Sequence, residues 1–428
     1  MNPSIAFVGM THLGLISGVA ASERGFQVVC FDSDVNLIDA LEKGEPHISE
    51  PHLIELMGKN HERLRFTSDA KLIRNCDVIY VAPDISTNDK GDSDLTTIDQ
   101  LLEIVFQHAD KENVIVILSQ VPPGFTRSKT RANQDLYYQV ETLIFGQAIE
   151  RALYPERYII GCSNPSELLP MTYLKVLKAY ECPILPMRFE SAELAKISIN
   201  MCLVSLITTA NTLAELCEEI GADWSEIAPA LRLDKRIGQY AYLNPGLGIS
   251  GGNLERDLAT VTSYANCYGT DDGVVRAWIS NSQRRKNWIW TSFKKLELNK
   301  KLIKKVGVLG LTYKENTHSV KNSPALVFLS QLAGWNIMAY DPLAAPKAAP
   351  TYVTRVNSVL EVLRGADVLV LSTAWPEFRL INSNMLLENM KGRVVIDPYR
   401  LLDGASLRSH GFSYLTLGVF SEVKSISS

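Results

Sequence analysis

Residues 5–32 read IAFVGMTHLGLISGVAASERGFQVVCFD. A short apolar run ends in Gly9, a helical pattern follows to about Arg24, and a second apolar run, Gln27–Phe31, ends at Asp32. A strand, a helix and a strand in this order are typical of a βαβ unit, whose two strands lie parallel in one sheet.

Alternating strand and helix patterns continue outward from this unit. A second alternating block begins near Lys301, and its first helix is expected over Ser323–Ala333, with Pro324 in the first turn. Further strands are expected at Cys76–Val81, Val114–Leu118, Val306–Leu309, Ile337–Tyr340, Val368–Leu371 and Val394–Ile396. We therefore predict an α/β protein with two Rossmann-like domains, each a doubly wound parallel sheet.

The residues between the two blocks have helical spacing. A long helix is expected from Glu190 to Gly221, and a glycine-rich loop, Asn244–Gly252, precedes another helical stretch. We predict three domains, residues 1–190, 191–298 and 299–428, in which the central helix and the helical middle segment join the two α/β domains.

Composition excludes several classes of protein. The 428 residues are 46% hydrophobic and 21% charged, as in a folded globular protein, and the net charge of −4 argues against a general nucleic-acid binder. Seven cysteines without C-x-x-C spacing favour reduced thiols in the cytoplasm over a zinc site or a disulfide framework. No signal peptide is expected, and the apolar stretch Ile197–Ala210 is too short and too polar to span a bilayer.

The turn after the first strand reads GMTHLG, a dinucleotide fingerprint whose middle glycine is Thr11. Gly9 permits the tight turn, Gly14 permits close helix packing, and Asp32 suits a ribose hydroxyl, which favours NAD over NADP. We assign these residues and Leu13 to the cofactor. An ordinary βαβ turn without a ligand is the alternative.

Two further motifs carry polar residues with regular spacing. SQVPPGFTR, residues 119–127, is a stiff loop at the carboxyl edge of the sheet, and we assign its Ser119 and Gln120 to the cofactor. In ELAKISIN, Lys196 and Asn200 are four residues apart and share one helix face, where they could hold an oxyanion or a sugar hydroxyl. The alternatives are a rigid turn and a solvated lysine.

The fourth motif is DKRIGQYAYLNPGLGISGGNLERDL, residues 234–258. Its glycines let a backbone approach a ligand closely, and Arg236 can pair with a phosphate through two parallel hydrogen bonds. A flexible surface loop is the alternative. The glycines are Gly238, Gly246, Gly248, Gly251 and Gly252.

With these motifs in order from about residue 3 to residue 405, the chain resembles the UDP-glucose/GDP-mannose dehydrogenase family. The resemblance implies an NAD-binding domain, a central dimer-forming segment and a C-terminal domain that binds a UDP-sugar, in an oxidoreductase of polysaccharide biosynthesis. It rests also on GEPHISEPHL (44–53), GLTYKENTHSVKNSPA (310–325) and DVLVLSTAWPEFR (367–379).

In active members of the family, NAD takes hydride from C6 of the hexose twice, and a cysteine holds the intermediate as a thioester before water releases a uronic acid. Here GISGGNLERD, residues 248–257, places Asn253 at the cysteine and Arg256 at the lysine of the family loop, and keeps Asp257. Cys267 follows 14 residues after Asn253, and we expect it inside a helix, facing a core.

The resemblance also assigns roles. Asp257 and Lys196 would manage the proton and the developing alkoxide, Asn200 would orient the hydroxyl, and Glu141 would align with a glutamate that helps thioester hydrolysis. Arg236 and Lys314 would hold the diphosphate, residues 246–252 would wrap it, and Arg256 would add positive charge. Further departures from the family are Thr11, the loop Ala82–Ser86, Gln120, Ser319 and Lys321.

The sequence therefore predicts an NAD-dependent oxidation of a sugar hydroxyl to a carbonyl, by a cytoplasmic homodimer that acts on a UDP-hexose. Three alternatives remain open: full oxidation to a uronate through a hydrated aldehyde, a catalytically silent binding subunit, and redox-neutral use of a tightly held NAD.

Overall fold

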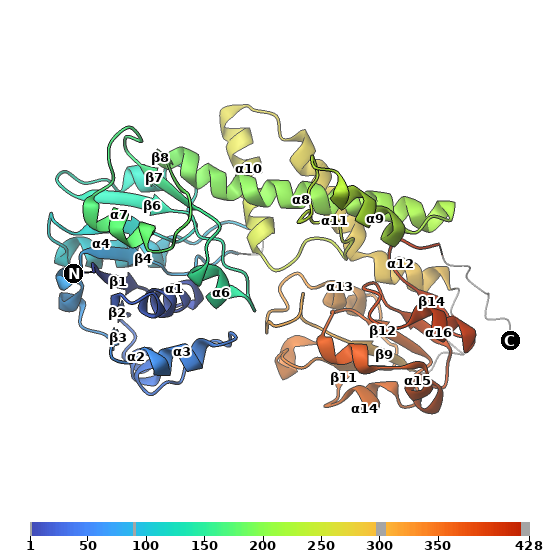
Figure 1. The fold of residues 1–428 in the computed structure, drawn as a ribbon. Helices are drawn as coiled ribbons and strands as arrows, with labels where there is room; N and C mark the ends of the chain where they lie inside the picture. Colours follow the sequence, from blue (N-terminus) through green and yellow to red (C-terminus); the bar gives the residue numbers. More distant parts are fainter. Residues whose placement is uncertain (1, 89–90, 297–304, 421–428) are drawn as a thin grey trace. The chain divides into compact units, whose positions relative to one another are not determined.

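The computed structural model describes residues 2–88, 91–296 and 305–420 (Figure 1). The chain divides into two compact units, Met1–Ile199 and Asn200–Ser428, and each is described by itself. The beginning of the second α/β block, near Lys301, lies outside the described residues. The three domain boundaries predicted from the sequence stay a prediction.

The Met1–Ile199 unit is built on an eight-stranded sheet of order β3-β2-β1-β4-β5-β6-β7-β8. Neighbouring strands are parallel except β6 and β7. The chain order reverses beside β1, and ligands of doubly wound sheets bind at the carboxyl ends of the strands at this point. The strands are β1 (Ser4–Val8), β2 (Gln27–Phe31), β3 (Leu64–Thr67), β4 (Val78–Val81), β5 (Val114–Ile117), β6 (Asp135–Gln139), β7 (Tyr158–Cys162) and β8 (Ile184–Arg188).

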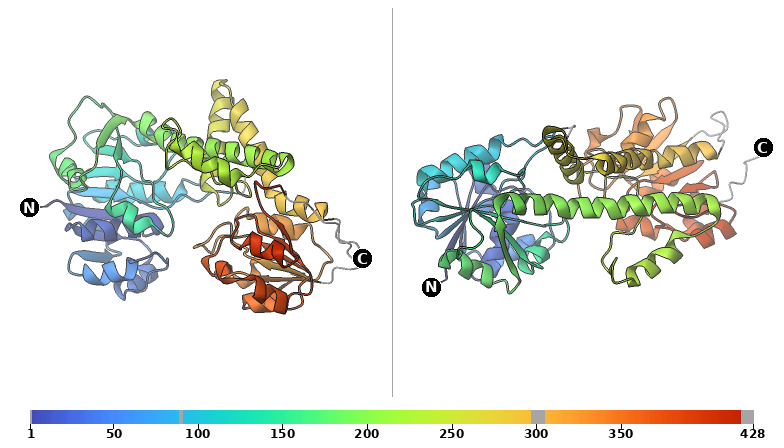
Figure 2. Two further views of the ribbon diagram at one scale, coloured as in Figure 1. Left: turned by 45° about the vertical axis from the view of Figure 1, so that its right-hand side comes forward. Right: turned by 90° about the horizontal axis from the view of Figure 1, so that it is seen from above.

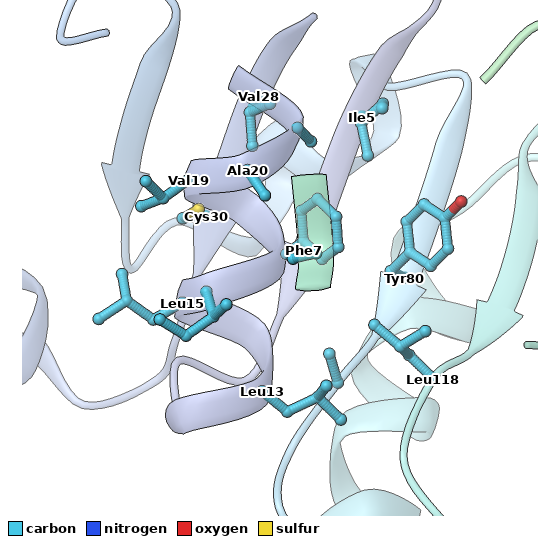
Figure 3. Packing of buried hydrophobic residues seen from close by; sticks show 14 of the residues in the cluster. Ile5, Phe7, Leu13, Leu15, Val19, Ala20, Val28, Cys30, Tyr80 and Leu118 are labelled. Atoms are coloured by element: carbon cyan, nitrogen blue, oxygen red, sulfur yellow. The ribbon is translucent and has the colours of Figure 1, made fainter. Parts of the chain in front are cut away.

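Helices cover both faces of this sheet. On one face α1 packs over Phe7 and Tyr80, whose rings stack with centroids 4.9 Å apart (Figure 3). The opposite face carries a second core that includes Leu102 of α4. The helices are α1 (His12–Glu23), α2 (Val35–Glu42), α3 (Leu53–Lys59), α4 (Thr96–His108), α5 (Phe125–Ser128), α6 (Ala148–Leu153) and α7 (Met171–Lys178).

The Asn200–Ser428 unit holds a six-stranded, all-parallel sheet of order β11-β10-β9-β12-β13-β14. Its topology repeats that of the first six strands of the other sheet, so the predicted fold class is confirmed. The strands are β9 (Val306–Leu309), β10 (Ile337–Tyr340), β11 (Val353–Arg355), β12 (Val368–Leu371), β13 (Val394–Ile396) and β14 (Ser413–Leu415). The helices beside them are α13 (Pro324–Ser330), α14 (Val359–Leu363), α15 (Ser383–Asn389) and α16 (Gly404–Ser409).

The helix predicted over Ser323–Ala333 begins as expected and ends early. The Ser323 side chain accepts a hydrogen bond from the Ala325 N–H, which caps the first turn. After Ser330 the backbone bonds shorten to the three-residue spacing of a tighter turn, as in the bond from Gln331 N to Phe328 O, so the last predicted turn is not α-helical.

The long helix α8 (Phe189–Ile220) is continuous over 32 residues, and the division between the two units falls within it (Figure 2). It is long and apolar enough to cross a membrane by length and composition alone, as core helices of soluble proteins also are. The expectation that the apolar stretch Ile197–Ala210 is too short to span a bilayer was therefore wrong for the helix that contains it, because this helix extends well beyond residues 197–210. After it come α9 (Trp224–Leu233), α10 (Asn253–Tyr268), α11 (Gly273–Lys286) and α12 (Trp288–Lys295).

Candidate active site

The turn between β1 and α1 needs both of its fingerprint glycines. Gly9 has a φ of +97°, in the region that favours glycine. A Cβ on Gly14 would lie 2.0 Å from the carbonyl oxygen of Gly9, so the helix can approach the strand only because Gly14 has no side chain. Because no side chain fills the turn at Gly9 and Gly14, a pyrophosphate can approach the backbone N–H groups at the start of the helix. The turn therefore fits NAD.

Asp32 closes the turn from the end of β2. Its Oδ2 accepts a hydrogen bond of 2.7 Å from the Met10 N–H, and its Oδ1 accepts one of 3.0 Å from the Asp34 N–H. Each oxygen keeps a further acceptor site, so the carboxylate can still receive a ribose hydroxyl. Leu13, in contrast, packs its side chain into the hydrophobic core, so it can contribute only backbone to a cofactor.

Thr11, which replaces the middle glycine of the fingerprint, forms a hydrogen bond with the loop Ala82–Ser86, which also differs from the family pattern. Its hydroxyl accepts a hydrogen bond of 2.8 Å from the N–H of Asp84, in the Ala82–Ser86 loop. From the other side, the buried Ser119 hydroxyl donates to the carbonyl oxygen of Pro83 at 2.5 Å. The loop Ala82–Ser86 thus joins two predicted cofactor segments, the turn with Thr11 and the segment with Ser119, and the neighbouring Gln120 is half-buried.

Glu193 holds the Ser119–Arg127 loop against α8, a role that sequence reasoning missed. Its buried carboxylate accepts hydrogen bonds from the N–H groups of Gly124 at 2.6 Å and Thr126 at 2.8 Å. Burial raises the pKa of Glu193, although these two N–H groups oppose the shift. Lys196 lies one helical turn further along α8, so the loop and the lysine share a rigid support.

Glu141 and Lys196 lie near each other in the Met1–Ile199 unit. Burial raises the pKa of Glu141, whereas the Thr142 N–H and the positive charges of Lys196 and Arg151 lower it. A carboxyl whose pKa is raised by burial and opposed by a lysine is a candidate for proton transfer.

In the Asn200–Ser428 unit, α8 and α10 meet through Asn200 and Asp257. The Asn200 amide donates a hydrogen bond of 2.5 Å to Asp257 Oδ2, and the Arg256 Nε donates to Asp257 Oδ1 at 3.3 Å. All three side chains are buried. Asn253 is the first residue of α10 and is exposed, and it shares a helix face with Asp257 four residues later.

Thiols of the same unit lie elsewhere. Cys267 is in α10 as predicted, but it is exposed rather than facing a core, and a 14-residue separation places it about 21 Å along the helix axis from Asn253. Cys202 is two residues from Asn200 on α8, so it points away from that side chain. Burial raises the pKa of the Cys217 thiol, which disfavours the nucleophilic thiolate.

The glycine-rich loop packs on the protein itself. Gly251 has a φ of +94°, and a Cβ there would lie 2.4 Å from the Tyr313 ring, next to Lys314. A Cβ on Gly248 would lie 2.5 Å from the carbonyl oxygen of Ser282. The loop is also held by hydrogen bonds from Gly246 N to Asn211 Oδ1 at 2.8 Å and from Gly251 N to Lys321 O at 3.3 Å. Gly252, with a φ of +103°, directly precedes α10.

Arg236 is exposed and pairs with a neighbouring carboxylate. Its side chain is 89% exposed, and its guanidinium donates two hydrogen bonds to the carboxylate of Asp234. A phosphate would have to compete with that carboxylate for the guanidinium.

In the turn after β9, backbone N–H groups donate their hydrogen bonds to a side chain of the protein itself, Asp341. Its carboxylate accepts hydrogen bonds from the N–H groups of Leu311 at 2.6 Å, Thr312 at 3.0 Å and Ala344 at 2.7 Å. Burial raises the pKa of Asp341, but these donors outweigh it and the pKa is lowered. Unlike Asp32, Asp341 therefore has little capacity left for a ribose. Across residues 2–88, 91–296 and 305–420, no group of three or more His, Cys, Asp or Glu side chains is placed to hold a metal ion.

Models of three domains of one family match the chain. They are the NAD binding domain of the UDP-glucose/GDP-mannose dehydrogenase family, over residues 3–179, its central domain, over 190–283, and its UDP binding domain, over 307–404. UDP-glucose 6-dehydrogenase TuaD of Bacillus subtilis is 30% identical, over 97% of this chain and 93% of its own length. UDP-glucose 6-dehydrogenase of Rickettsia conorii is 29% identical, over 97% and 99%. The structure of a UDP-glucose dehydrogenase from Pyrobaculum islandicum gives a TM-score of 0.82 at 25% identity, covering 95% of this chain and 98% of that one.

Proposed function

Because the chain belongs to the UDP-glucose/GDP-mannose dehydrogenase family, we propose that it oxidises the C6 hydroxyl of a nucleotide-linked hexose and stops at the aldehyde. The observation that carries this proposal is the start of α10. Asn253 stands one turn before the buried Asp257, and the nearest cysteine in that helix is about 21 Å away along its axis.

The chemistry of the second oxidation explains why the side chain at Asn253 matters. An aldehyde gives up hydride readily only after a nucleophile has added to its carbonyl carbon. A thiolate adds and later leaves, whereas a carboxamide nitrogen is too weakly nucleophilic to do so. The reaction here therefore ends after two electrons.

The residues of this chain would divide the first oxidation between them. NAD, when bound at the Gly9–Gly14 turn, supplies the acceptor for one hydride from C6. The hydroxyl proton must leave at the same time, and Asp257 and Lys196 are the proton acceptor and the stabiliser of the developing alkoxide. Asn200, fixed on Asp257, orients the hydroxyl.

Full oxidation to a uronate is the nearest alternative. A hydrated aldehyde does carry a hydride, and Glu141, with its raised pKa, could take a proton from the attacking water. Mass spectrometry of the products from UDP-glucose, its amino-sugar relatives and GDP-mannose separates the two reactions. An aldehyde or its hydrate supports our proposal, and a uronic acid as the main product contradicts it.

A silent binding subunit and a redox-neutral enzyme are further alternatives. The bond between Thr11 and Asp84 does not distinguish these two alternatives from each other. Calorimetry with NAD and UDP-sugars, combined with a turnover assay, identifies a silent binding subunit if the ligands bind but no NADH is formed. Cofactor that stays with the protein through chromatography indicates the second.

We expect a cytoplasmic homodimer that prefers UDP-sugars over GDP-sugars. Three apolar residues of α8 lie on one face and are exposed, namely Leu213, Leu216 and Ile220. A contiguous apolar face of this kind supports pairing with a second copy, and light scattering after gel filtration measures it. A monomer of 47.6 kDa would contradict this expectation.

A further inference from the structure

Glu50 belongs to the GEPHISEPHL motif, between α2 and α3, and the proposed reaction gives it no task. Its side chain is completely buried, with 0% exposure. A carboxylate is costly to remove from water unless hydrogen-bond donors surround it. The donors around Glu50 come from two segments of the Met1–Ile199 unit, the dinucleotide turn and the loop that carries Glu141.

The first segment is the loop that carries Glu141. The N–H of Gly146 lies 2.9 Å from both carboxylate oxygens of Glu50, and the N–H of Ala148 lies 3.4 Å from Oε2. These contacts fasten the end of the loop, at the point where α6 begins.

The start of the same loop has a fastening of its own. Arg151 of α6 donates a hydrogen bond of 2.8 Å from Nε to the carbonyl oxygen of Thr142. The six residues between Glu141 and α6 are thus held from both ends, and Glu50 holds the end nearer to the helix. Movement of Glu50 would therefore move the loop on which Glu141 sits.

The second segment is the dinucleotide turn. His12 follows Thr11 directly and begins α1, and its Nε2 lies 2.9 Å from Glu50 Oε1 with the imidazole 10% exposed. The imidazole also packs against the tilted ring of Phe145, with ring centroids 4.2 Å apart. His12 therefore contacts the Glu141 loop twice, through Glu50 and directly.

Hydrogen bonds to a buried carboxylate are short and strict in geometry, because the charge has no water to replace a lost donor. Displacing His12 while Gly146 stays would leave one oxygen of Glu50 short of a donor. In the low-energy arrangement the dinucleotide turn and the Glu141 loop both donate to the Glu50 carboxylate. A restraint on one segment is therefore passed to the other.

We propose that Glu50 is a positioning residue that couples the dinucleotide turn to the loop carrying Glu141, so that a dinucleotide held at the turn restrains that loop. The proposal rests on the proposed function in one respect, the choice of NAD as the ligand.

Amide hydrogen exchange of the whole chain, with and without NAD, tests the coupling. In the unchanged protein we expect NAD to slow exchange in residues 141–149 about fivefold or more, besides slowing it at the turn itself. His12→Gln keeps an N–H donor and should retain this response. His12→Leu removes the donor and should lose the response in 141–149 while the turn stays protected.

A measurement without ligand separates this proposal from the proposed function. In the ligand-free protein, His12→Leu should exchange faster in residues 141–149 than His12→Gln does. His108→Leu is the matched control, because His108 bonds only within α4 in the described structure, to the Ile104 carbonyl. Calorimetry that finds no NAD binding contradicts the proposed function, and the ligand-free comparison then still decides the coupling. Equal exchange of 141–149 in the Leu and Gln variants overturns it.

Discussion

The side-chain amide of Asn200 donates a hydrogen bond of 2.5 Å to the carboxylate of Asp257. The other oxygen of that carboxylate faces Arg256 at 3.3 Å, and both acidic and basic side chains are buried. The pair fixes the carboxylate in one orientation, one helical turn after Asn253. In our proposal this carboxylate receives a proton from the substrate hydroxyl, and the residue one turn before it carries an amide in place of a thiol.

Asp257→Asn should reduce kcat about 100-fold or more, because it removes the proton acceptor. It also removes the negative charge that faces the buried Arg256, which should lower the free energy of unfolding by about 3 kcal/mol. Steady-state kinetics and urea unfolding measure the two effects. Asp39→Asn, at an exposed carboxylate of α2, is the control, and an unchanged kcat in Asp257→Asn would exclude the assigned role.

Thr11→Gly should strengthen NAD binding about fivefold. The change frees the Asp84 N–H, worth about 1 kcal/mol as a hydrogen-bond donor, and clears the backbone for the pyrophosphate. Thr11→Ser keeps the hydroxyl and should bind NAD as the unchanged protein does. Calorimetry gives the dissociation constants, and weaker binding by Thr11→Gly would mean that the Thr11–Asp84 bond supports the cofactor site.

Glu141→Gln should change how stability depends on pH. Burial raises the pKa of Glu141 in the folded protein, so the folded state favours the protonated acid. The resulting stabilisation is complete below the ordinary glutamate pKa of about 4.3 and is lost as pH rises through the raised value. The melting temperature of Glu141→Gln, relative to the unchanged protein, should therefore increase from pH 4 to higher pH. A difference that stays constant across this range would show that Glu141 is not perturbed.

Asn253→Cys should restore uronate formation. A cysteine at the first position of α10 lies at a helix N-terminus, where the thiolate is stabilised, and it can add to the aldehyde. Asn253→Ser adds a weaker nucleophile and should still stop at the aldehyde. The products are identified by mass spectrometry after incubation with UDP-glucose and NAD. Absence of uronate with the cysteine in place would indicate that other departures, such as Arg256, also block the second step.

Much of the fold follows from local sequence patterns. The apolar runs that end before Gly9 and Asp32 predict β1 and β2. The need for glycine at position 14 is also local, and the close approach of Gly14 to the carbonyl oxygen of Gly9 confirms it. The long helix up to Gly221 was also predictable, because its spacing is unbroken. The length of its apolar part was underestimated, because residues 197–210 are only the most apolar portion of the helix Phe189–Ile220.

The contacts that shape the candidate site could not be predicted in the same way. Glu50 and Gly146 are 96 residues apart, and Glu193 and Gly124 are 69 residues apart, so no local pattern joins them. For Arg236 a motif predicts a phosphate ligand, which stays a prediction, and the structure adds that the side chain is exposed and paired with Asp234. Residue types indicate chemistry, but tertiary packing decides which of those residues meet.

The number of NADH molecules formed for each sugar consumed tests the central claim most directly. UDP-glucose is supplied in limiting amount with excess NAD, NADH is read by its absorbance, and the remaining sugar is counted by chromatography. Our account predicts one NADH for each UDP-glucose, in keeping with an amide at position 253. Two NADH for each sugar, from protein with its natural Asn253, would contradict it.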